Sequence, residues 1–168
     1  MLSPQPGAGV LPPLGGQGPV GAGCGTLAGM TSHTFLFHMR REECEELLAT
    51  STVGRLAVVV EGHPEIFPVV HVFDRDRACV AFPTNAGTKL YSALDWPFVA
   101  YEIDGVDPGG DSGWSVLVVG RAEEVTDAEE MARLAGQRVA PWLGEGQVRW
   151  LRIVPSKVTG RRISTSTS

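Results

Sequence analysis

Residues 82–90 combine amino-acid types that can bind a phosphate group. The segment reads Phe-Pro-Thr-Asn-Ala-Gly-Thr-Lys-Leu and joins a β-forming run to a short helical pattern. Glycine lets backbone amides approach an anion, hydroxyls donate hydrogen bonds, and a helix start and a lysine add positive charge. Thr84, Thr88 and Lys89 are therefore candidate phosphate ligands. Each has an alternative, because threonines commonly cap helices and a lysine near a helix start is commonly only solvated.

Other groups that could do chemistry are few. The sequence contains no Ser-His-Asp set, no carboxylate dyad, no P-loop and no His/Cys cluster with zinc spacing. His71 could act as an acid–base group, although a histidine among apolar strand residues is more often buried and hydrogen-bonded. Trp114, Trp142 and Trp150 could stack on a ligand or pack in the core or an interface. Arg55 could bind an anion or form a surface ion pair.

The composition limits the class of protein. The chain has 168 residues, 43% of them hydrophobic, and a formal net charge of −5, which suits one globular domain and argues against a nucleic-acid partner. No apolar run is long enough for a membrane span. Three scattered cysteines without a C-x-x-C pair favour a reducing, cytoplasmic location. Residues 1–29 are nearly half Gly and Pro and predict a flexible tail, which leaves residues 30–168 as the folded domain.

Hydrophobic periodicity places the phosphate-binding pattern within a β-rich fold. We expect helices over residues 40–50, 88–94 and 126–139, and a frayed tail from residue 164. The expected strands are 54–60, 65–73, 78–82, 97–103, 114–125 and 148–154. Six strands with short hairpins and small helices indicate a closed antiparallel barrel. Several strands are apolar on both faces, so we also expect a second subunit to cover the outer face.

This order of elements resembles the FMN-binding split barrel of the pyridoxamine 5′-phosphate oxidase-like family. The resemblance covers roughly residues 40–163 and depends on three motifs. They are Val-Gly-Arg-Leu-Ala at 53–57 with Phe-Pro-Val-Val at 67–70, the loop at 82–90, and Gly-Trp-Ser-Val-Leu-Val-Val-Gly-Arg-Ala-Glu at 113–123.

The resemblance implies a mainly β fold with small helices, a six-stranded antiparallel split barrel of the flavin-binding type. It also implies a homodimer with FMN at the subunit interface and hydride transfer to or from a small-molecule substrate. Relatives bind a deazaflavin or haem instead, so these cofactors stay open. A protein whose cofactor performs the chemistry needs no nucleophile of its own. The candidate cofactor contacts are Arg55, Pro68, Val69, Val70, Phe82, Thr84, Thr88, Lys89, Ser115, Trp142 and Arg161.

Two departures from the family pattern leave the reaction open. The end of the chain, Gly-Arg-Arg-Ile at 160–163, lacks the arginine and histidine with which the true oxidase handles pyridoxal phosphate, which argues against vitamin B6 oxidation. Pro83 stands where nitroimidazole-reductase-like relatives have a histidine. The chain is either a flavin-dependent oxidoreductase or a non-catalytic protein that stores or senses a flavin, deazaflavin or haem. Its catalytic residues and substrate are unassigned.

Overall fold

The computed structural model describes residues 32–137 and 148–167. The predicted tail at 1–29 and Trp142 lie outside the described residues, so the predicted domain boundary stays a prediction. In chain order the elements are β1 (Ser32–Met39), α1 (Arg41–Thr50), β2 (Val53–Val60), β3 (His63–Val70), β4 (Val72–Asp74), β5 (Cys79–Asn85), α2 (Thr88–Asp95), β6 (Phe98–Val106), β7 (Ser112–Val125), α3 (Ala128–Ala135) and β8 (Val148–Thr167).

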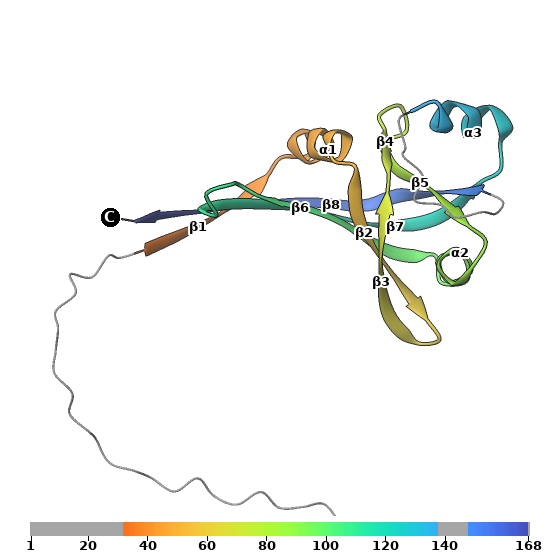
Figure 1. The fold of residues 1–168 in the computed structure, drawn as a ribbon, viewed down its shortest axis with the longest axis horizontal. Helices are drawn as coiled ribbons and strands as arrows, with labels where there is room; N and C mark the ends of the chain where they lie inside the picture. The colour runs from red at the N-terminus through yellow and green to blue at the C-terminus, as the bar shows by residue number, and fades with distance from the viewer. Residues whose placement is uncertain (1–31, 138–147, 168) are drawn as a thin grey trace, which may run out of the picture. The chain divides into compact units, whose positions relative to one another are not determined.

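The strands form one curled antiparallel sheet, which confirms the expected split barrel (Figure 1). The sheet has eight strands instead of the six predicted, in the order β3-β2-β6-β7-β8-β5-β4, with β1 paired to β8. A single run of chain supplies β3 and β4, which occupy the two ends of this order. The predicted strand at 65–73 is therefore two strands, the first paired with β2 and the second with β5. This exchange of partners at His71 curls the sheet.

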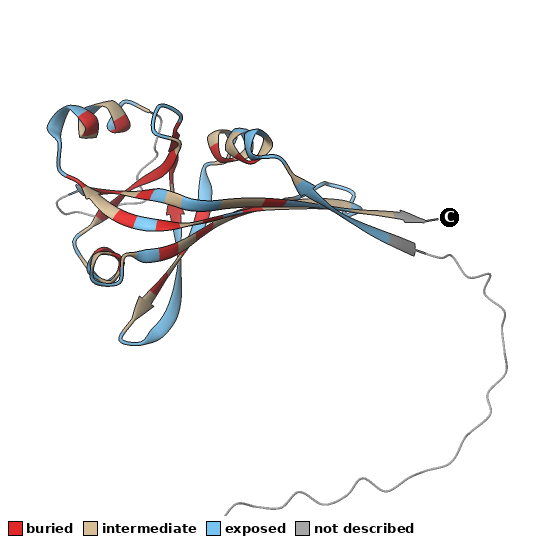
Figure 2. Cartoon of the chain, turned by 180° about the vertical axis from the view of Figure 1, so that it is seen from behind, coloured by how far each residue is buried: buried red, intermediate tan, exposed pale blue. Residues whose placement is uncertain are grey.

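The chain also has strands that the sequence pattern did not predict. β1 precedes the first predicted helix and pairs with β8 along its whole length, from Ser32 opposite Thr167 to Met39 opposite Gly160. The expected frayed tail from residue 164 is wrong, because β8 continues to Thr167. Pairing with distant β1 supplies hydrogen bonds that a local pattern cannot reveal. Figure 2 shows this β1–β8 extension with mostly exposed residues beyond the buried core.

The three helices lie outside the sheet and are short. α3 begins where Asp127 accepts a hydrogen bond from the backbone N–H of Glu130 at 2.8 Å, close to the predicted start. α1 turns Cys44 and Leu48 into the core and its acidic residues outward. Within residues 32–137 and 148–167, no helix has the length and apolar character needed to cross a bilayer.

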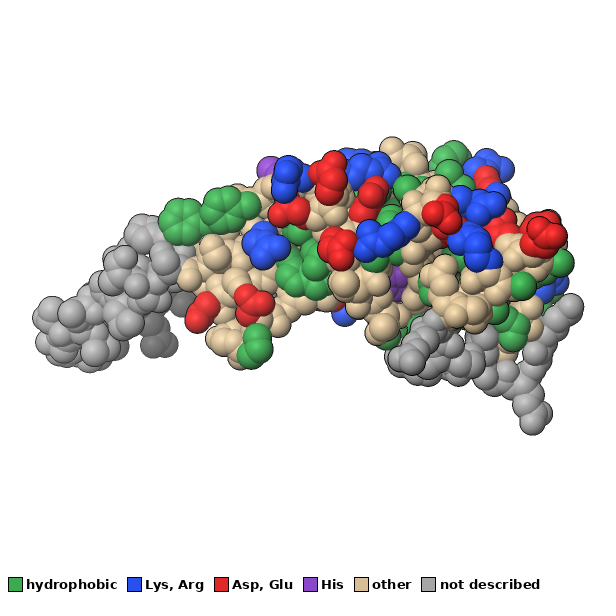
Figure 3. Space-filling view, turned by 90° about the horizontal axis from the view of Figure 1, so that it is seen from above, with side chains coloured by type: hydrophobic (Ala, Val, Ile, Leu, Met, Phe, Trp, Pro, Cys, Tyr) green, Lys and Arg blue, Asp and Glu red, His purple; other side chains and the backbone are tan. Residues whose placement is uncertain are grey.

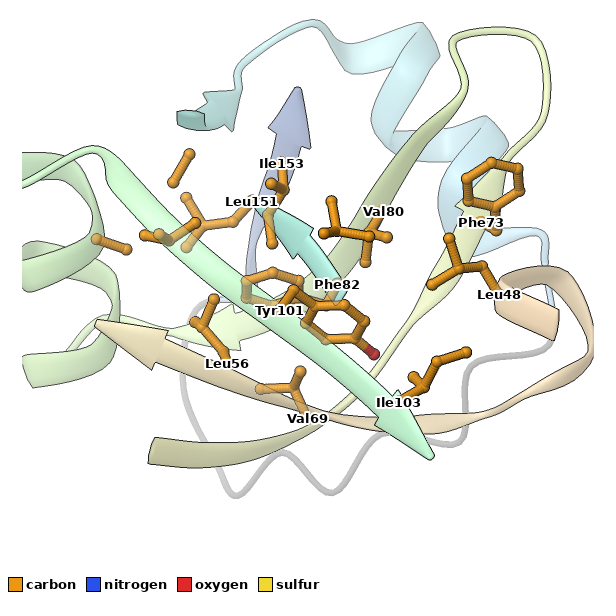
Figure 4. Packing of buried hydrophobic residues seen from close by; sticks show 14 of the residues in the cluster. Leu48, Leu56, Val69, Phe73, Val80, Phe82, Tyr101, Ile103, Leu151 and Ile153 are labelled. Atoms are coloured by element: carbon orange, nitrogen blue, oxygen red, sulfur yellow. The ribbon is translucent and has the colours of Figure 1, made fainter. Parts of the chain in front are cut away.

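The hydrophobic core fills the concave side of the sheet. Phe82 from β5 and Tyr101 from β6 are fully buried at its centre (Figure 4). Along β6, Val99, Tyr101 and Ile103 are buried, whereas the residues between them lie on the opposite face. This alternation assigns every second residue of β6 to the outer face of the sheet.

Ion pairs fasten α3 to the sheet. Arg133 of α3 donates two hydrogen bonds to Asp74, whose side chain is only 1% exposed. Burial alone would raise the pKa of Asp74, but Arg133 and backbone amides hold the pKa below its ordinary value. Arg152 of β8 donates to Glu123 at 3.0 Å and to Glu130 of α3 at 3.2 Å. Acidic and basic side chains alternate over the face that carries α1 and α3 (Figure 3).

His71 is held inside the fold and is not available as an acid–base group. Its Nε2 lies 2.9 Å from the Leu48 carbonyl oxygen, and its Nδ1 lies 2.6 Å from the Tyr101 hydroxyl. A carbonyl can only accept, so Nε2 carries the proton and Nδ1 accepts from Tyr101. Burial lowers the pKa of His71, which keeps the ring neutral. The imidazole therefore joins the end of α1 to β6 at the point where the chain exchanges strand partners.

The buried neutral state of His71 predicts a pH-dependent stability. An unfolded histidine titrates near pH 6.5, at about its ordinary pKa, so below that pH the unfolded chain binds a proton that the folded protein excludes. The free energy of unfolding should therefore be highest above about pH 6.5 and fall as the pH drops toward the lower folded pKa. Urea denaturation at pH 7.5, 6.5 and 5.5 should show a shallower decline for His71→Asn than for the wild type.

The control is His63→Asn, which replaces an exposed histidine. This variant should keep the wild-type dependence on pH. Equal slopes for all three proteins would show that His71 does not carry the effect.

Candidate functional site

The strand register places five residues in one row across the outer face of the sheet. Arg55 of β2 lies opposite Pro68 of β3 on one side and Glu102 of β6 on the other. Glu102 is opposite Leu117 of β7, and Leu117 is opposite Thr159 of β8. Directly paired residues share a face, so the row runs from the edge strand β3 to β8 on the side away from the core.

A second row lies beside the first and completes a hollow. Asp104 of β6 pairs with Ser115 of β7, and Ser115 pairs with Arg161 of β8. The hollow between these strands has a volume of about 240 Å³. Its lining residues are Glu102, Ser115, Leu117, Thr159 and Arg161.

Arg55 and Arg161 of this face have different surroundings. Arg55 donates to Glu102 at 2.8 Å and to Asp104 at 2.6 Å, so the ion-pair alternative for Arg55 is the one observed. The hydrogen bond to Asp104, followed by that to Glu102, raises the pKa of Arg55. In the described part of the chain, Arg161 is exposed and has no ion pair or side-chain hydrogen bond. Arg161 is thus an available cation of this face, and so are the exposed Arg121, opposite Phe98, and Lys157, opposite Val119.

The other half of the outer face has an exposed apolar strip beside the cations Arg121 and Lys157. Ala57 lies opposite Ile66 and Ala100, and Ala100 lies opposite Val119. Phe98 follows at the start of β6 and is 74% exposed, and Ile66 is 65% exposed. Exposed apolar strips of this kind are typical of surfaces that bind another molecule.

The β5–α2 loop divides the candidate phosphate ligands between the core and the surface. Phe82 is fully buried, and Thr84 is only 2% exposed with its hydroxyl donating to the Asn85 carbonyl at 3.3 Å. Thr88 is exposed and is the first residue of α2. No side chain caps this helix start, where Gly87 is the N-cap residue. Lys89 follows in the first turn, and its side chain lies outside the described part of the structure.

The remaining predicted contacts lie on β3. Val69 is 3% exposed and faces the core, whereas Pro68 is exposed on the outer face and Val70 is half-buried. Among the described strands β3 pairs only with β2, so its other edge has backbone groups that are not bonded to a strand. A bound molecule can use such an edge.

The structure therefore brings together part of the predicted set. Arg55, Pro68, Ser115 and Arg161 share the outer face, and Thr88 lies at the start of α2. Phe82, Thr84 and Val69 contribute to the interior. Four residues of the face were not predicted as contacts: Glu102, Asp104, Leu117 and Thr159. For Glu102 and Asp104, the alternation of polar and apolar residues over 100–105 was the available signal.

Trp114 and Trp150 have packing roles. Trp150 is buried, and Trp114 packs over Gly105, where a Cβ atom would lie 2.7 Å from the indole. Within residues 32–137 and 148–167, no group of three His, Cys, Asp or Glu side chains could hold a metal ion.

Comparisons with known proteins agree with this fold and extend over most of the chain. The family model for pyridoxamine 5′-phosphate oxidase matches residues 40–162. An uncharacterized protein of Mycobacterium tuberculosis is 36% identical over 127 residues, which are 73% of this chain and 82% of that protein. The structure of an FAD binding protein from Mycobacterium smegmatis is 33% identical, has a TM-score of 0.64, and is matched over 75% of this chain and 98% of that one. The structure of a heme binding protein from Mycobacterium smegmatis shares the fold at 16% identity, with a TM-score of 0.61 over 75% of this chain and 57% of that one.

The burial of Phe82 predicts that its replacement mainly affects stability. Phe82→Ala removes a ring from the centre of the core and should lower the free energy of unfolding by about 3–5 kcal/mol. Chemical denaturation measures this loss. Tyr91→Ala, at an exposed aromatic residue of α2, is the control and should change stability by less than about 0.5 kcal/mol. A Phe82→Ala protein as stable as the wild type would contradict the observed packing.

Proposed function

The chain belongs to the pyridoxamine 5′-phosphate oxidase family, and on this premise we propose that it binds FMN between two copies of itself. The protein would then be an oxidoreductase that acts on a small molecule, with the hydride chemistry supplied by the flavin. The observation that carries the proposal is the outer face of the sheet, where an apolar strip adjoins a row of hydrogen-bonding side chains. A planar ring system with one polar edge needs these two surfaces side by side.

The residues present fit the ring end of a flavin. Ala57, Ala100 and Leu117 offer small or apolar contacts to a flat ring. Arg161 and Ser115 can donate hydrogen bonds to a polar edge, and the unpaired edge of β3 adds backbone groups. The site has a face for stacking and donors at one side.

The residues also fit the phosphate end. The first N–H groups of α2 have no partner inside the helix, and they carry partial positive charge. A Cβ atom added at Gly87 would meet nothing within 4 Å, so an anion has open access to this helix start. The exposed hydroxyl of Thr88 and the charge of Lys89 add to the site.

The protein's part in the reaction is binding and orientation. A bound flavin supplies the hydride chemistry through its own ring. Apolar residues of the face exclude water from one side of the ring, and Arg161 fixes its polar edge. His71 has both ring nitrogens committed inside the core and takes no proton from a substrate.

One observation favours a second candidate, a non-catalytic module that stores or senses a flavin, deazaflavin or haem. Glu102 and Asp104 are tied to Arg55, and His71 is buried, so the described part of the face has no uncommitted acid–base group. An absorption spectrum separates haem from flavin by the Soret band. Steady turnover with NADH or NADPH and an acceptor would exclude the storage function.

FMN binding predicts a loss of affinity when the cation of the α2 start is removed. Lys89→Gln should weaken FMN binding roughly tenfold or more, because a charge-assisted hydrogen bond to phosphate is lost. Quenching of flavin fluorescence measures the affinity, and bound FMN should raise the melting temperature.

The control for the loss of one positive charge is Arg75→Gln, which changes an exposed arginine of the turn after β4 that pairs with Glu46. This variant should bind FMN as the wild type does. A wild-type protein that is colourless as isolated, and that FMN neither stabilises nor binds, would refute the proposal.

A homodimer predicts that a charge on the apolar strip separates the subunits. Phe98→Asp should convert a dimer into monomers and weaken FMN binding, since a buried unpaired carboxylate is costly. Sedimentation velocity measures the association state. Tyr91→Asp, on exposed α2, is the control and should stay dimeric. A monomeric wild-type protein at micromolar concentration would argue against the interface.

A further inference from the structure

We propose that β1 is a docking edge for a second copy of this chain, and that the two β1 strands pair antiparallel about a twofold axis at Leu36. The contact joins the sheets of two copies edge to edge. It is separate from the proposed FMN interface and does not depend on it.

β1 is a long strand with one free edge. It has eight residues, and among the described strands it pairs only with β8. Every second residue of β1 therefore points its backbone N–H and C=O away from β8. The strand contains no proline, lysine or carboxylate, and its register with β8 has no bulge. Natural proteins use such features to keep strand edges from pairing, so β1 is open to a partner strand.

The strands at the two ends of the strand order differ from β1 in this respect. β3 carries Pro64, Glu65 and Pro68, and a proline has no N–H to donate to a neighbouring strand. β4 has only three residues. Of these three edges, β1 alone offers a long uninterrupted row of backbone groups, to which a strand of another chain can add.

The aromatic residues of β1 lie on the face of the sheet that carries α1. Met39 is opposite Gly160, where an added Cβ atom would lie 2.5 Å from the Cys44 sulfur of α1. Phe37 and Phe35 precede Met39 at every second position, so they share this face. Their rings stack with centroids 6.4 Å apart, and both side chains are about half exposed. Figure 3 shows hydrophobic side chains at the β1 end of this face.

The opposite face of the same segment has an aliphatic row. Leu36 is opposite Ile163 of β8. Across β8, Ile163 is opposite Gly113 of β7, which is opposite Val106 of β6. Leu36, Ile163 and Val106 are 53%, 44% and 72% exposed. Both faces of the segment are therefore apolar and uncovered in the described part of the chain, and a strand added at the edge contacts both faces at once.

The sequence of β1 is self-complementary. An antiparallel pair centred on Leu36 sets Phe35 of each copy opposite Phe37 of the other copy. On the opposite face, the same pair joins the aliphatic rows of the two copies at Leu36. Among the possible centres along β1, Leu36 alone pairs both phenylalanines with phenylalanine, and cross-strand aromatic pairs stabilise antiparallel sheets. One surface meets its own copy, as a twofold interface requires.

The contact is small, so the association is weak. The eight residues of β1 span about 27 Å at about 3.4 Å per residue. One strand edge of this length buries less than about 1,200 Å², the range of transient complexes. We expect a dissociation constant on the order of 100 µM. The proposed FMN-linked dimer is then the species at micromolar concentration, and dimers pair into tetramers at higher concentration.

Sedimentation velocity between about 10 and about 500 µM, a range on both sides of the expected dissociation constant, tests the edge. The full-length chain carries Phe98→Asp, which disrupts the proposed FMN interface, and its mass should double toward the upper concentration. Leu36→Lys in this background should abolish the doubling, because like charges would face each other at the axis. The matched control is Tyr91→Lys, which places the same charge on an exposed aromatic residue of α2 and should keep the doubling.

The register has a test of its own. Leu36→Glu should also abolish the doubling. An equimolar mixture of the Leu36→Lys and Leu36→Glu proteins should double in mass again, because opposite charges then meet at the axis. Leu36 is 53% exposed, so both variants should keep the melting temperature of the parent protein, which shows that the fold is intact.

Each outcome decides a separate point. A Phe98→Asp chain that stays at its starting mass at the upper concentration would overturn the proposal, and so would doubling that survives Leu36→Lys. A mixture of the two charged variants that fails to associate would overturn the register centred on Leu36. A wild-type protein that is monomeric at micromolar concentration, with or without FMN, and doubles at high concentration only when Leu36 is present, would refute the FMN-linked dimer and leave this edge standing.

Discussion

The fold depends on the point where one segment of the chain stops pairing with β2, as β3, and starts pairing with β5, as β4. His71 occupies this point and is hydrogen-bonded to the Leu48 carbonyl and the Tyr101 hydroxyl. Its backbone N–H also donates to the Thr52 carbonyl at 3.0 Å. These bonds connect α1, β4 and β6, so they fix where the sheet begins to curl. The core forms on the concave side, and the outer face takes its order from the same register.

Sequence reasoning reached the architecture because its signals are local. The strand pattern, together with the turns between the strands, was enough to predict an antiparallel barrel, and the resemblance to the family motifs added that it is a split barrel. The pairing of β1 with β8 was missed because it joins residues more than a hundred positions apart. Phe82 and Thr84 were predicted to contact the cofactor, but both faces of β5 are buried in the structure.

The candidate site was only partly predictable for the same reason. Arg55, Ser115 and Arg161 were named from family motifs, whereas their meeting on one face follows from the registers of four strands. Glu102 and Asp104 carry no motif. Their importance comes from sharing Arg55, an interaction between residues 47 and 49 positions apart in sequence. Alternation along β6 therefore links the core to the site, since Tyr101 points inward and its neighbour Glu102 points outward.

The pairing of β1 with β8 has a mechanical consequence. Ser32 and Thr167 are direct neighbours in an antiparallel pair, so a force that pulls these two positions apart acts across the strands. The hydrogen bonds of β1 then bear the load one after another, as in unzipping, and not together, as in shear. β1 is the weak mechanical element of the domain under such a load. After β1 separates, the long β8 would still be paired with β5 and β7.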